Sequence, residues 1–394
     1  MSIRVLIVDD SAFMRHALGR LLGEAPGFEI VGSAANGVEG LQKARELRPD
    51  VITLDVEMPI LDGLSMLKLL MHEAPTRVVM LSSKTTHNAQ VTLDALEYGA
   101  IDFVPKPSGS LSIDITRVGD ELIAKIQAAA SMSEAAFLRH RQTAVMALAA
   151  RGTQEAPTGG ASGPTHSALP EARGPRPCPE RPREASAGPR IASRKLVVVA
   201  SSTGGPGALH VLVSGLPATL GASMIIVQHM PPGFTASLAG RLDQCGKMPC
   251  KEAIDDDLLV ADRAFVAPGD HHLIASTRGF VQLVRLPPVN GVRPAADVTL
   301  QAVAPIYRQR LLAVVLTGMG SDAREGCRAV KLHGGTVFAQ DQATSTIYGM
   351  PSAVAEAGLT DRILPLPEIA EAISAWAATE AWAGDGESRT AMAS

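Results

Sequence analysis

The sequence is poor in aromatic residues, in cysteine and in net charge, and each shortage excludes a class of protein. Aromatic residues make up 3% of the 394 residues, and 4 cysteines are too few for a disulfide framework. The 36 Lys and Arg against 40 Asp and Glu give a net charge of −4, so electrostatics favours neither nucleic acid nor an anionic membrane surface as a partner. No apolar run is long enough to cross a bilayer. We expect no nucleic-acid partner and no membrane insertion.

The first apolar run begins at Ile3, which leaves no room for a signal peptide, so we expect a cytoplasmic protein. Cys245 and Cys250 lack the spacing of a zinc site, and we expect free, reduced thiols. The neighbours His271 and His272 could suggest a metal site. Adjacent side chains point in opposite directions, however, and a structural role is favoured.

Composition divides the chain into four parts. Residues 1–128 and 194–380 alternate short apolar runs with amphipathic stretches, which is typical of parallel sheets covered by helices. Residues 129–193 are rich in Ala, Pro, Gly, Ser and Arg and predict a flexible linker, although 132–150 contains helix formers that could extend the first domain. The arginines of this linker are interpreted as solvated charge rather than a docking patch. Residues 381–394 predict a disordered tail.

The expected fold class is α/β in both domains. The apolar runs predict strands and the amphipathic stretches predict helices, and residues 272–275 and 280–284 flank a turn that predicts an antiparallel hairpin and hence a mixed second sheet. Ser11 and Asp62 are placed to cap helices, and Gly99 and Gly334 to end them. The strands expected in the two domains are 5–8, 51–54, 78–81 and 103–104, then 196–199, 224–227 and 311–316. Helices are expected in the second domain at 208–216, 234–243, 297–307, 321–333 and 368–377.

Acidic residues end two of the predicted strands of the first domain. Asp9 and Asp10 follow the first strand and Asp55 follows another, so their carboxylates converge at one edge of the sheet. Like charges at close range are costly, and a hydrated Mg²⁺ is the usual compensation. Ser82 and Lys106 follow two further strands and could hold a phosphoryl group on Asp55.

A serine, a histidine and an aspartate follow three predicted strands of the second domain. Ser202 comes after 196–199, His229 after 224–227 and Asp322 after 311–316, which predicts a hydrolase site with His229 as general base and Asp322 as its orienting partner. Ser202 is favoured over Ser201 because small residues stand two positions before and after it, as a sharp turn requires.

A phosphate-binding loop is the alternative interpretation of Gly204, Gly205 and Gly207. A dinucleotide site would place an acidic residue after the next strand, where this chain has Gln228 and His229, so the nucleotide interpretation is weakened.

The first domain resembles the receiver domain of two-component response regulators. The matching motifs are Val-Asp-Asp at 8–10, Leu-Asp-Val-Glu-Met-Pro at 54–59, Asp-Gly at 62–63, Ser82 and Lys-Pro at 106–107. The resemblance implies a flavodoxin-like fold and phosphorylation of Asp55 by a chemotaxis histidine kinase. It also implies a Mg²⁺ ion bound by Asp9, Asp10, Asp55 and the carbonyl of Glu57, and a switch pair formed by Ser82 and Phe103.

The second domain resembles the chemotaxis protein-glutamate methylesterases. The matching motifs are Ala-Ser-Ser-Thr-Gly-Gly at 200–205, Gln-His-Met-Pro at 228–231, Ala-Pro-Gly-Asp-His-His at 267–272, Leu-Thr-Gly-Met-Gly-Ser-Asp at 316–322, Phe-Ala-Gln-Asp at 338–341 and Tyr-Gly-Met-Pro at 348–351. The resemblance implies a doubly wound, mostly parallel domain with Ser202, His229 and Asp322 as a triad and Thr203 and Met319 beside it. Ala323 departs from the family, which more often has Gly there.

The resemblance implies a hydrolase that is activated by phosphorylation and needs no cofactor for the esterase. Its substrates would be γ-glutamyl methyl esters, and also glutamines, of methyl-accepting chemotaxis receptors. A non-catalytic signalling adaptor and a serine peptidase stay open as alternatives.

Overall fold

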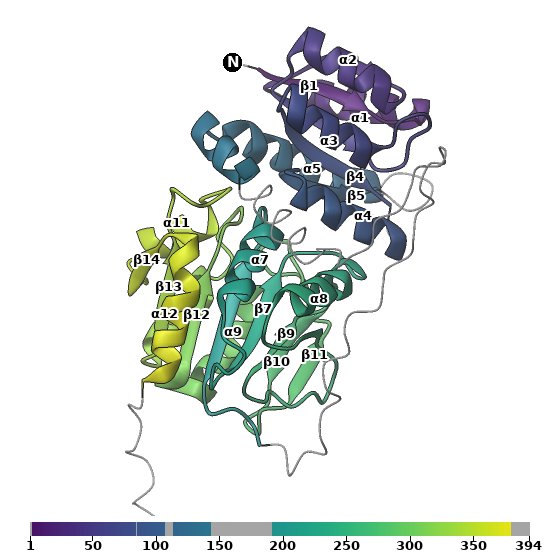
Figure 1. Cartoon of the computed structure of the whole chain (residues 1–394). Helices are drawn as coiled ribbons and strands as arrows, with labels where there is room; N and C mark the ends of the chain where they lie inside the picture. Colours follow the sequence, from purple (N-terminus) through teal and green to yellow (C-terminus); the bar gives the residue numbers. More distant parts are fainter. Residues whose placement is uncertain (1, 84, 107–112, 143–190, 380–394) are drawn as a thin grey trace, which may run out of the picture.

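A computed structural model describes residues 2–83, 85–106, 113–142 and 191–379, and shows two α/β domains stacked along the chain (Figure 1). The predicted fold class is confirmed in both domains. The part of the predicted linker at 143–190, including its arginines and Cys178, and the predicted tail at 381–394 lie outside the described residues.

The N-terminal domain contains a five-stranded sheet in the order β2-β1-β3-β4-β5 in which all neighbours are parallel. This is the flavodoxin-like order. Its strands are β1 (Ile3–Val8), β2 (Phe28–Ala34), β3 (Val51–Asp55), β4 (Arg77–Ser82) and β5 (Asp102–Pro105). Its helices are α1 (Ala12–Glu24), α2 (Gly37–Leu47), α3 (Gly63–Glu73), α4 (Thr86–Glu97) and α5 (Ile113–Ser131).

The local signals predicted at helix ends are confirmed. Ser11 accepts a hydrogen bond from the N–H of Met14 at the start of α1, and Asp62 caps α3 in the same way. Gly99 and Gly334 both have positive φ directly after helices. Strand β2 was not among the predicted strands, because it is an edge strand whose residues are mostly only partly buried.

The C-terminal domain contains a seven-stranded sheet in the order β14-β13-β12-β6-β7-β9-β8, and every described pairing in it is parallel. Its strands are β6 (Leu196–Ser201), β7 (Ser223–Gln228), β8 (Cys250–Glu252), β9 (Arg263–Val266), β12 (Leu311–Val315), β13 (Thr336–Gln340) and β14 (Arg362–Leu364). The helices are α7 (Gly205–Gly215), α8 (Phe234–Cys245), α9 (Ala296–Tyr307), α10 (Arg324–Leu332), α11 (Met350–Glu356) and α12 (Leu366–Ala378), with the 3₁₀ turn η1 at Arg308–Arg310.

The predicted hairpin exists, but the prediction that it makes the second sheet mixed is wrong. Strands β10 (His272–Ala275) and β11 (Val281–Val284) form a separate antiparallel sheet. Helix α9 lies against β10, where the Thr299 hydroxyl donates to the carbonyl of Leu273 at 2.7 Å. Strand β10 thus pairs only with β11 among the described strands, and its contact with Thr299 holds α9.

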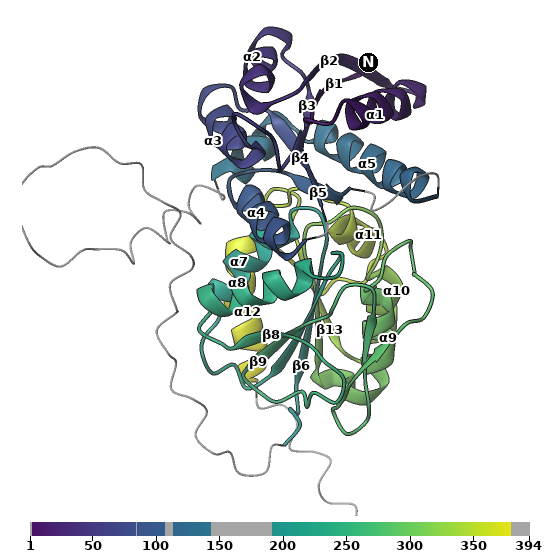
Figure 2. The ribbon, with the colours of Figure 1, turned by 90° about the vertical axis from the view of Figure 1, so that its right-hand side faces the viewer.

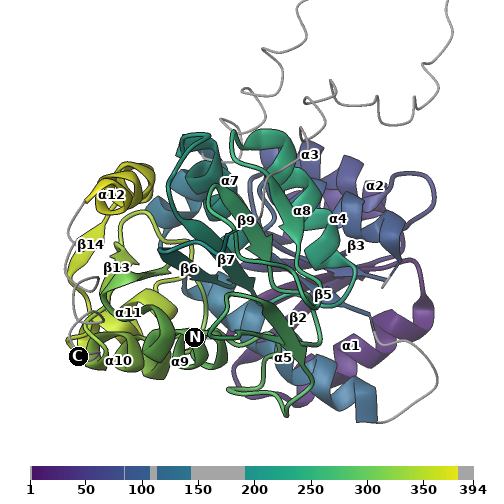
Figure 3. The same ribbon diagram turned by 90° about the horizontal axis from the view of Figure 1, so that it is seen from below.

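The topology of the seven-stranded sheet fixes where a site can form. The chain starts at the central strand β6, continues through β7 to the edge strand β8, inserts β9 between β7 and β8, and then returns to β12 on the other side of β6. Figure 3 shows α7, α8 and α12 on one face of this sheet and α9, α10 and α11 on the other. The loops after β6 and β12 therefore diverge to opposite faces, and such a switch point is where ligands bind in doubly wound sheets.

The two domains meet through α4, which lies against α7 and α8 in both side views (Figures 1 and 2). One buried apolar cluster continues from the receiver-like sheet into the α7, α8 and α12 face of the second sheet. In the described part of the chain, no helix has the length and apolar character needed to cross a membrane.

The first residues of the predicted linker pack against the N-terminal domain. Helix α5 continues to Ser131 and a further helix follows at 134–142, where Phe137 is buried in the apolar cluster. The Arg77 guanidinium lies 5.1 Å from the centre of the Phe137 ring and also donates to the carbonyl of Met132. The folded unit therefore extends to at least residue 142.

Replacing Phe137 by Ala is expected to destabilise the N-terminal domain by about 3 kcal/mol, because it removes a fully buried ring and leaves a cavity. Leu138 is the matched control, since its side chain is 40% exposed on the same helix. Leu138→Ala should cost less than about 1 kcal/mol. Denaturant unfolding of both full-length variants measures the difference, and equal losses would contradict the packing of residues 134–142.

Candidate active site

The turn after β6 distinguishes its two serines. Ser201 is fully buried, and its hydroxyl donates to the side-chain oxygen of Gln228 at 2.7 Å. Ser202 stands one residue further, only partly buried, with its N–H bonded to the carbonyl of Thr317 at 3.1 Å. Gly204 follows with φ of 76°, a conformation that glycine adopts without strain, and starts α7. Of the two serines, Ser202 is therefore the more accessible.

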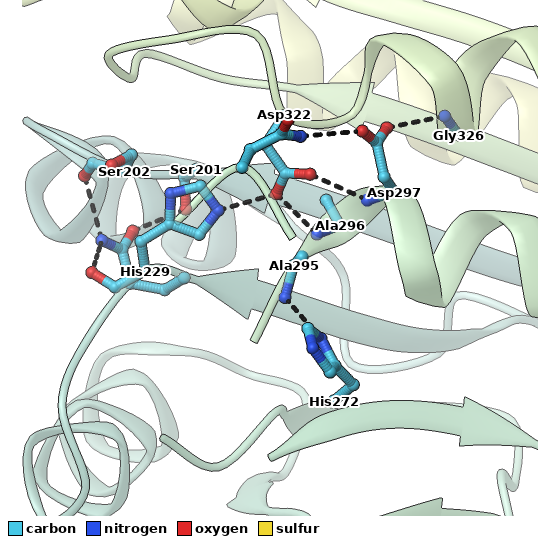
Figure 4. A network of polar contacts seen from close by, with 11 residues as sticks. Ser201, Ser202, His229, His272, Ala295, Ala296, Asp297, Asp322 and Gly326 are labelled. Carbon is cyan, nitrogen blue, oxygen red and sulfur yellow. Dashed lines mark hydrogen bonds and ion pairs between the residues drawn. The ribbon is translucent and has the colours of Figure 1, made fainter. Parts of the chain in front are cut away.

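His229 and Asp322 form the polar pair beside this turn. The Nε2 atom of His229 lies 2.8 Å from a carboxylate oxygen of Asp322, and both side chains are buried. Figure 4 shows the imidazole ring between Ser202 and Asp322. The three residues predicted from separate strand ends are therefore brought together at the carboxyl edge of the sheet.

Asp322 is held by backbone as well as by His229. Its two oxygens accept hydrogen bonds from the N–H groups of Ala296 at 2.6 Å and Asp297 at 3.0 Å, at the start of α9. Burial by itself raises the pKa of Asp322, but the bond from His229 and the two amides outweigh it and keep the pKa below its usual value. Asp322 is thus ionised at neutral pH and can stabilise a positively charged imidazole.

The chain turns sharply after Asp322. Ala323 is buried and has φ of 78°, in the left-handed region that costs a residue with a side chain roughly 1–2 kcal/mol. This is the position where the sequence departs from the Gly that the resemblance leads one to expect, and here Ala323 is the N-cap residue of α10. The turn is secured from α9, where Asp297 accepts from the N–H of Gly326 at 2.7 Å.

Met319 and Thr203 flank the nucleophile candidate. Met319 lies in the loop that ends at Asp322, next to Gly318, where an added Cβ would come within 2.8 Å of the Ser202 Cβ. The Thr203 hydroxyl donates to the carboxylate of Asp102 in the N-terminal domain. Within the described residues, Ser202 makes no hydrogen bond with His229. The serine and its candidate base are therefore close but not engaged in this arrangement of the domains.

The acidic residues of the N-terminal domain also converge as predicted. The Lys106 ammonium lies 2.8 Å from Asp9 and 2.7 Å from Asp55. Oxygens of Asp9, Asp10 and Asp55 all lie within 4.8 Å of one another. Burial raises the pKa of Asp55 to about 6, against the opposing effect of Lys106. The pocket therefore holds more negative charge than one lysine neutralises.

This donor set fits Mg²⁺, which prefers carboxylate oxygen and retains several waters. Asp10 is exposed and free to reach an ion through solvent, whereas Asp9 and Asp55 are buried. Glu57 is exposed, and its N–H bonds to Asp55, so its backbone lies at the pocket. Asp9, Asp10, Asp55 and the backbone at Glu57 are therefore the groups that would hold such an ion.

The two predicted switch residues contact different elements, Ser82 helix α4 of its own domain and Phe103 helix α8 of the second domain. The Ser82 hydroxyl accepts a hydrogen bond from Thr92 of α4 at 2.7 Å. The Phe103 ring stacks on Phe234 of α8, with ring centres 4.5 Å apart and planes inclined by 18°. The Phe103 ring therefore lies in the domain junction.

A buried arginine completes the junction. Arg241 of α8 pairs with Asp94 at 2.8 Å and Glu97 at 3.0 Å, both on α4, and donates to the carbonyl of Gln90 at 2.6 Å. Sequence analysis missed Arg241 and Asp102, because no local pattern marks residues that meet across two domains. His140 bridges the same junction, with its ring nitrogens 3.2 Å from the Thr346 hydroxyl and 3.2 Å from the carbonyl of Ala100.

The histidine pair and the cysteines considered from the sequence do not form a metal site among the described residues. Within the described residues, the acidic pocket is the one group of carboxylate, histidine or cysteine side chains with metal-site spacing. His271 lies beside the carbonyl of Gly269, whereas His272 faces Ala295, so the two rings serve separate structural contacts as predicted. Among the described residues, Cys245, Cys250 and Cys327 form no disulfide bond.

Comparison with protein families agrees with both halves of the chain. Residues 5–114 match the response regulator receiver domain, and residues 197–373 match the CheB methylesterase family. A protein-glutamate methylesterase/protein-glutamine glutaminase of Symbiobacterium thermophilum is 45% identical over 94% of this chain and 96% of its own length. The relative of the same name from Thermotoga maritima is 41% identical over 94% and 97%, respectively.

Two solved structures are similar to the separate halves. The CheB methylesterase catalytic domain of Thermotoga maritima is 44% identical, covers 46% of this chain and 97% of its own, and aligns with a TM-score of 0.45. The response regulator domain of Thermotoga maritima CheB is 50% identical, covers 34% and 99%, and aligns with a TM-score of 0.32. The chain belongs to the family of protein-glutamate methylesterases/protein-glutamine glutaminases, with a response regulator receiver domain in front of its CheB methylesterase domain.

Proposed function

We propose that this enzyme removes methyl groups from γ-glutamyl methyl esters of methyl-accepting chemotaxis receptors, and deamidates glutamines of the same receptors, by a Ser-His-Asp mechanism. The observation that carries the proposal is the His229–Asp322 bond of 2.8 Å beside Ser202, at the switch point of the sheet. The enzyme works in the cytoplasm, where the receptor helices and the kinase meet. The esterase itself uses no cofactor.

The proposed mechanism uses a different ring nitrogen of His229 for each partner. Because Nε2 is bonded to Asp322, Nδ1 is the atom that takes the proton of Ser202. The serine oxygen attacks the ester carbonyl carbon, and the proton then passes to the leaving oxygen, which departs as methanol. Water, activated by the same nitrogen, cleaves the acyl-enzyme to free glutamate and restores the serine. An amide substrate follows the same path and releases ammonia.

In this proposal Thr203 supports the developing oxyanion, and Met319 lies beside the site. The N–H of the residue after a nucleophilic serine is a common oxyanion donor, and Thr203 occupies that place at the start of α7. Met319 lies on the loop that backs onto Ser202 and helps to define the space for the small methyl ester group.

The receiver domain inhibits the esterase in the arrangement described here. Asp102 holds the Thr203 hydroxyl and so places a carboxylate next to the site where negative charge must develop in the transition state. Receptor access is restricted by the same contact. A bias of about 2.8 kcal/mol toward this closed state leaves roughly one molecule in a hundred open.

Phosphorylation of Asp55 by the chemotaxis histidine kinase, with Mg²⁺ held by Asp9, Asp10, Asp55 and the Glu57 carbonyl, releases the inhibition. The phosphoryl group attracts Lys106 and the Ser82 hydroxyl. Ser82 then leaves Thr92, which loosens α4 and the contacts that α4 makes with Arg241. Phe103 moves with Ser82 and gives up its stacking on Phe234.

Ser202→Ala is expected to lower kcat by roughly 10⁴- to 10⁶-fold, because the triad acts as a unit. Ser201→Ala should keep activity within about tenfold, since the Ser201 hydroxyl is engaged by Gln228 away from the substrate. Methanol release from a methylated receptor fragment, in the presence of a small-molecule phosphodonor, measures both. An inactive Ser201→Ala beside an active Ser202→Ala would overturn the assignment.

Arg241→Ala is expected to raise the activity without phosphodonor at least about tenfold, toward the phosphodonor-stimulated rate. Truncating a buried charge that is paired across an interface costs about 2–5 kcal/mol, which is comparable to the whole bias toward the closed state. The control is Arg328→Ala on α10, which breaks an exposed pair with Glu325 within one helix. Methanol release with and without phosphodonor is the measurement, and an unchanged basal rate in Arg241→Ala contradicts the inhibitory role of the junction.

A further inference from the structure

The start of helix α9 has no cap from its own sequence. Its N-cap residue is Ala295, which has no side-chain oxygen, so the first amide groups of the helix need acceptors from elsewhere. Asp322 accepts from Ala296 and Asp297, as described above. The amide of Ala295 donates instead to Nδ1 of His272 at 3.1 Å. Three consecutive amides are thus satisfied by two side chains from distant parts of the domain (Figure 4).

The hydrogen bonds of His272 fix its protonation. A ring nitrogen that accepts from a backbone N–H carries no proton, so Nδ1 is the bare nitrogen. The other nitrogen, Nε2, lies 3.1 Å from the carbonyl of Pro287 and must be the donor. His272 is therefore a neutral imidazole with the proton on Nε2, and both of its nitrogens are engaged by backbone.

The position of this ring is rigid. His272 is completely buried and belongs to β10, whose hairpin partner β11 pairs with it along four residues. A second contact joins the same strand to the same helix, from the Thr299 hydroxyl to the carbonyl of Leu273 at 2.7 Å. The small antiparallel sheet therefore holds the first turn of α9 at two points.

We infer that His272 is a positioning residue for the hydrolytic triad, acting through the first turn of α9. It fixes the amide of Ala295, which sets the direction of the next two amides, and these hold the carboxylate of Asp322 against His229. The inference rests on the triad given under the proposed function. His272 itself is fully buried and touches no substrate, so its effect falls on the chemical step and not on binding.

The two hydrogen bonds of His272 predict which substitutions of this residue are tolerated. The Asn side-chain oxygen occupies nearly the position of the histidine Nδ1, so His272→Asn keeps an acceptor for Ala295 and loses the bond to Pro287. The Gln side-chain amide reaches nearer to the position of Nε2, so His272→Gln keeps the contact to Pro287 and loses the acceptor. His272→Leu loses both and leaves a buried amide unpaired.

The test is steady-state methanol release by the full chain, with saturating phosphodonor so that the receiver domain does not limit the rate. His272→Gln and His272→Leu are expected to lower kcat about 10- to 100-fold with KM changed less than about twofold, since a small displacement of a catalytic group is sufficient for such losses. His272→Asn should stay within about threefold of the original kcat. The control is His271→Asn, one residue away and bonded to a loop carbonyl, with no loss expected.

Equal losses in His272→Asn and His272→Gln would overturn the inference, as would an unchanged kcat in both or a loss confined to KM. If His272→Leu does not fold, the pair of Asn and Gln variants still decides. Ser202→Ala runs in the same assay. If it stays active, the proposed triad fails, whereas an inactive Ser202→Ala with equivalent Asn and Gln variants refutes the role of His272 alone.

Discussion

The hydrolytic site depends on one buried carboxylate. Asp322 accepts three hydrogen bonds, one from His229 and two from the first turn of α9, and together they join two distant segments of the chain to the loop after β12. A buried charge is expensive unless it is paired, so these bonds are as necessary to the fold as to the chemistry. The left-handed turn at Ala323 and the bond from Gly326 to Asp297 follow from holding Asp322 in this place.

The same topological rule builds both sites of the protein. In each domain the functional side chains follow parallel strands, at the edge where their carboxyl ends meet. The two sites communicate in the proposal through short paths. Ser82 is bonded to α4, which carries the partners of Arg241, and β5 contributes both Asp102 to Thr203 and Phe103 to Phe234. Few residues separate the acidic pocket from the serine, so a local change in charge can alter the junction.

The features predicted correctly from the sequence are those that depend on residues close together in the chain. Apolar runs that end in polar residues located Ser202, His229, Asp322 and the acidic pocket, and the structure brings each group together. Features made by long-range packing were missed or misplaced. The sequence predicted the hairpin at 272–284, but not that it packs against α9 apart from the main sheet. The alternation of residues along a strand does not specify which element the strand packs against. Arg241 lies in a predicted helix, and Phe137 lies in the predicted linker. Only their tertiary contacts reveal their roles.

The most direct test of this account is Asp322→Asn in the full chain with saturating phosphodonor. The oxygen of Asp322 that contacts His229 also accepts from Ala296, so an amide that presents N–H toward His229 keeps an acceptor only for Asp297. Because the charge is lost as well, kcat should fall roughly 10³- to 10⁴-fold while KM stays nearly constant. The melting temperature should decrease by only a few degrees, since the cap of α9 is partly retained. A variant that keeps its activity within about tenfold would contradict the central role of this carboxylate.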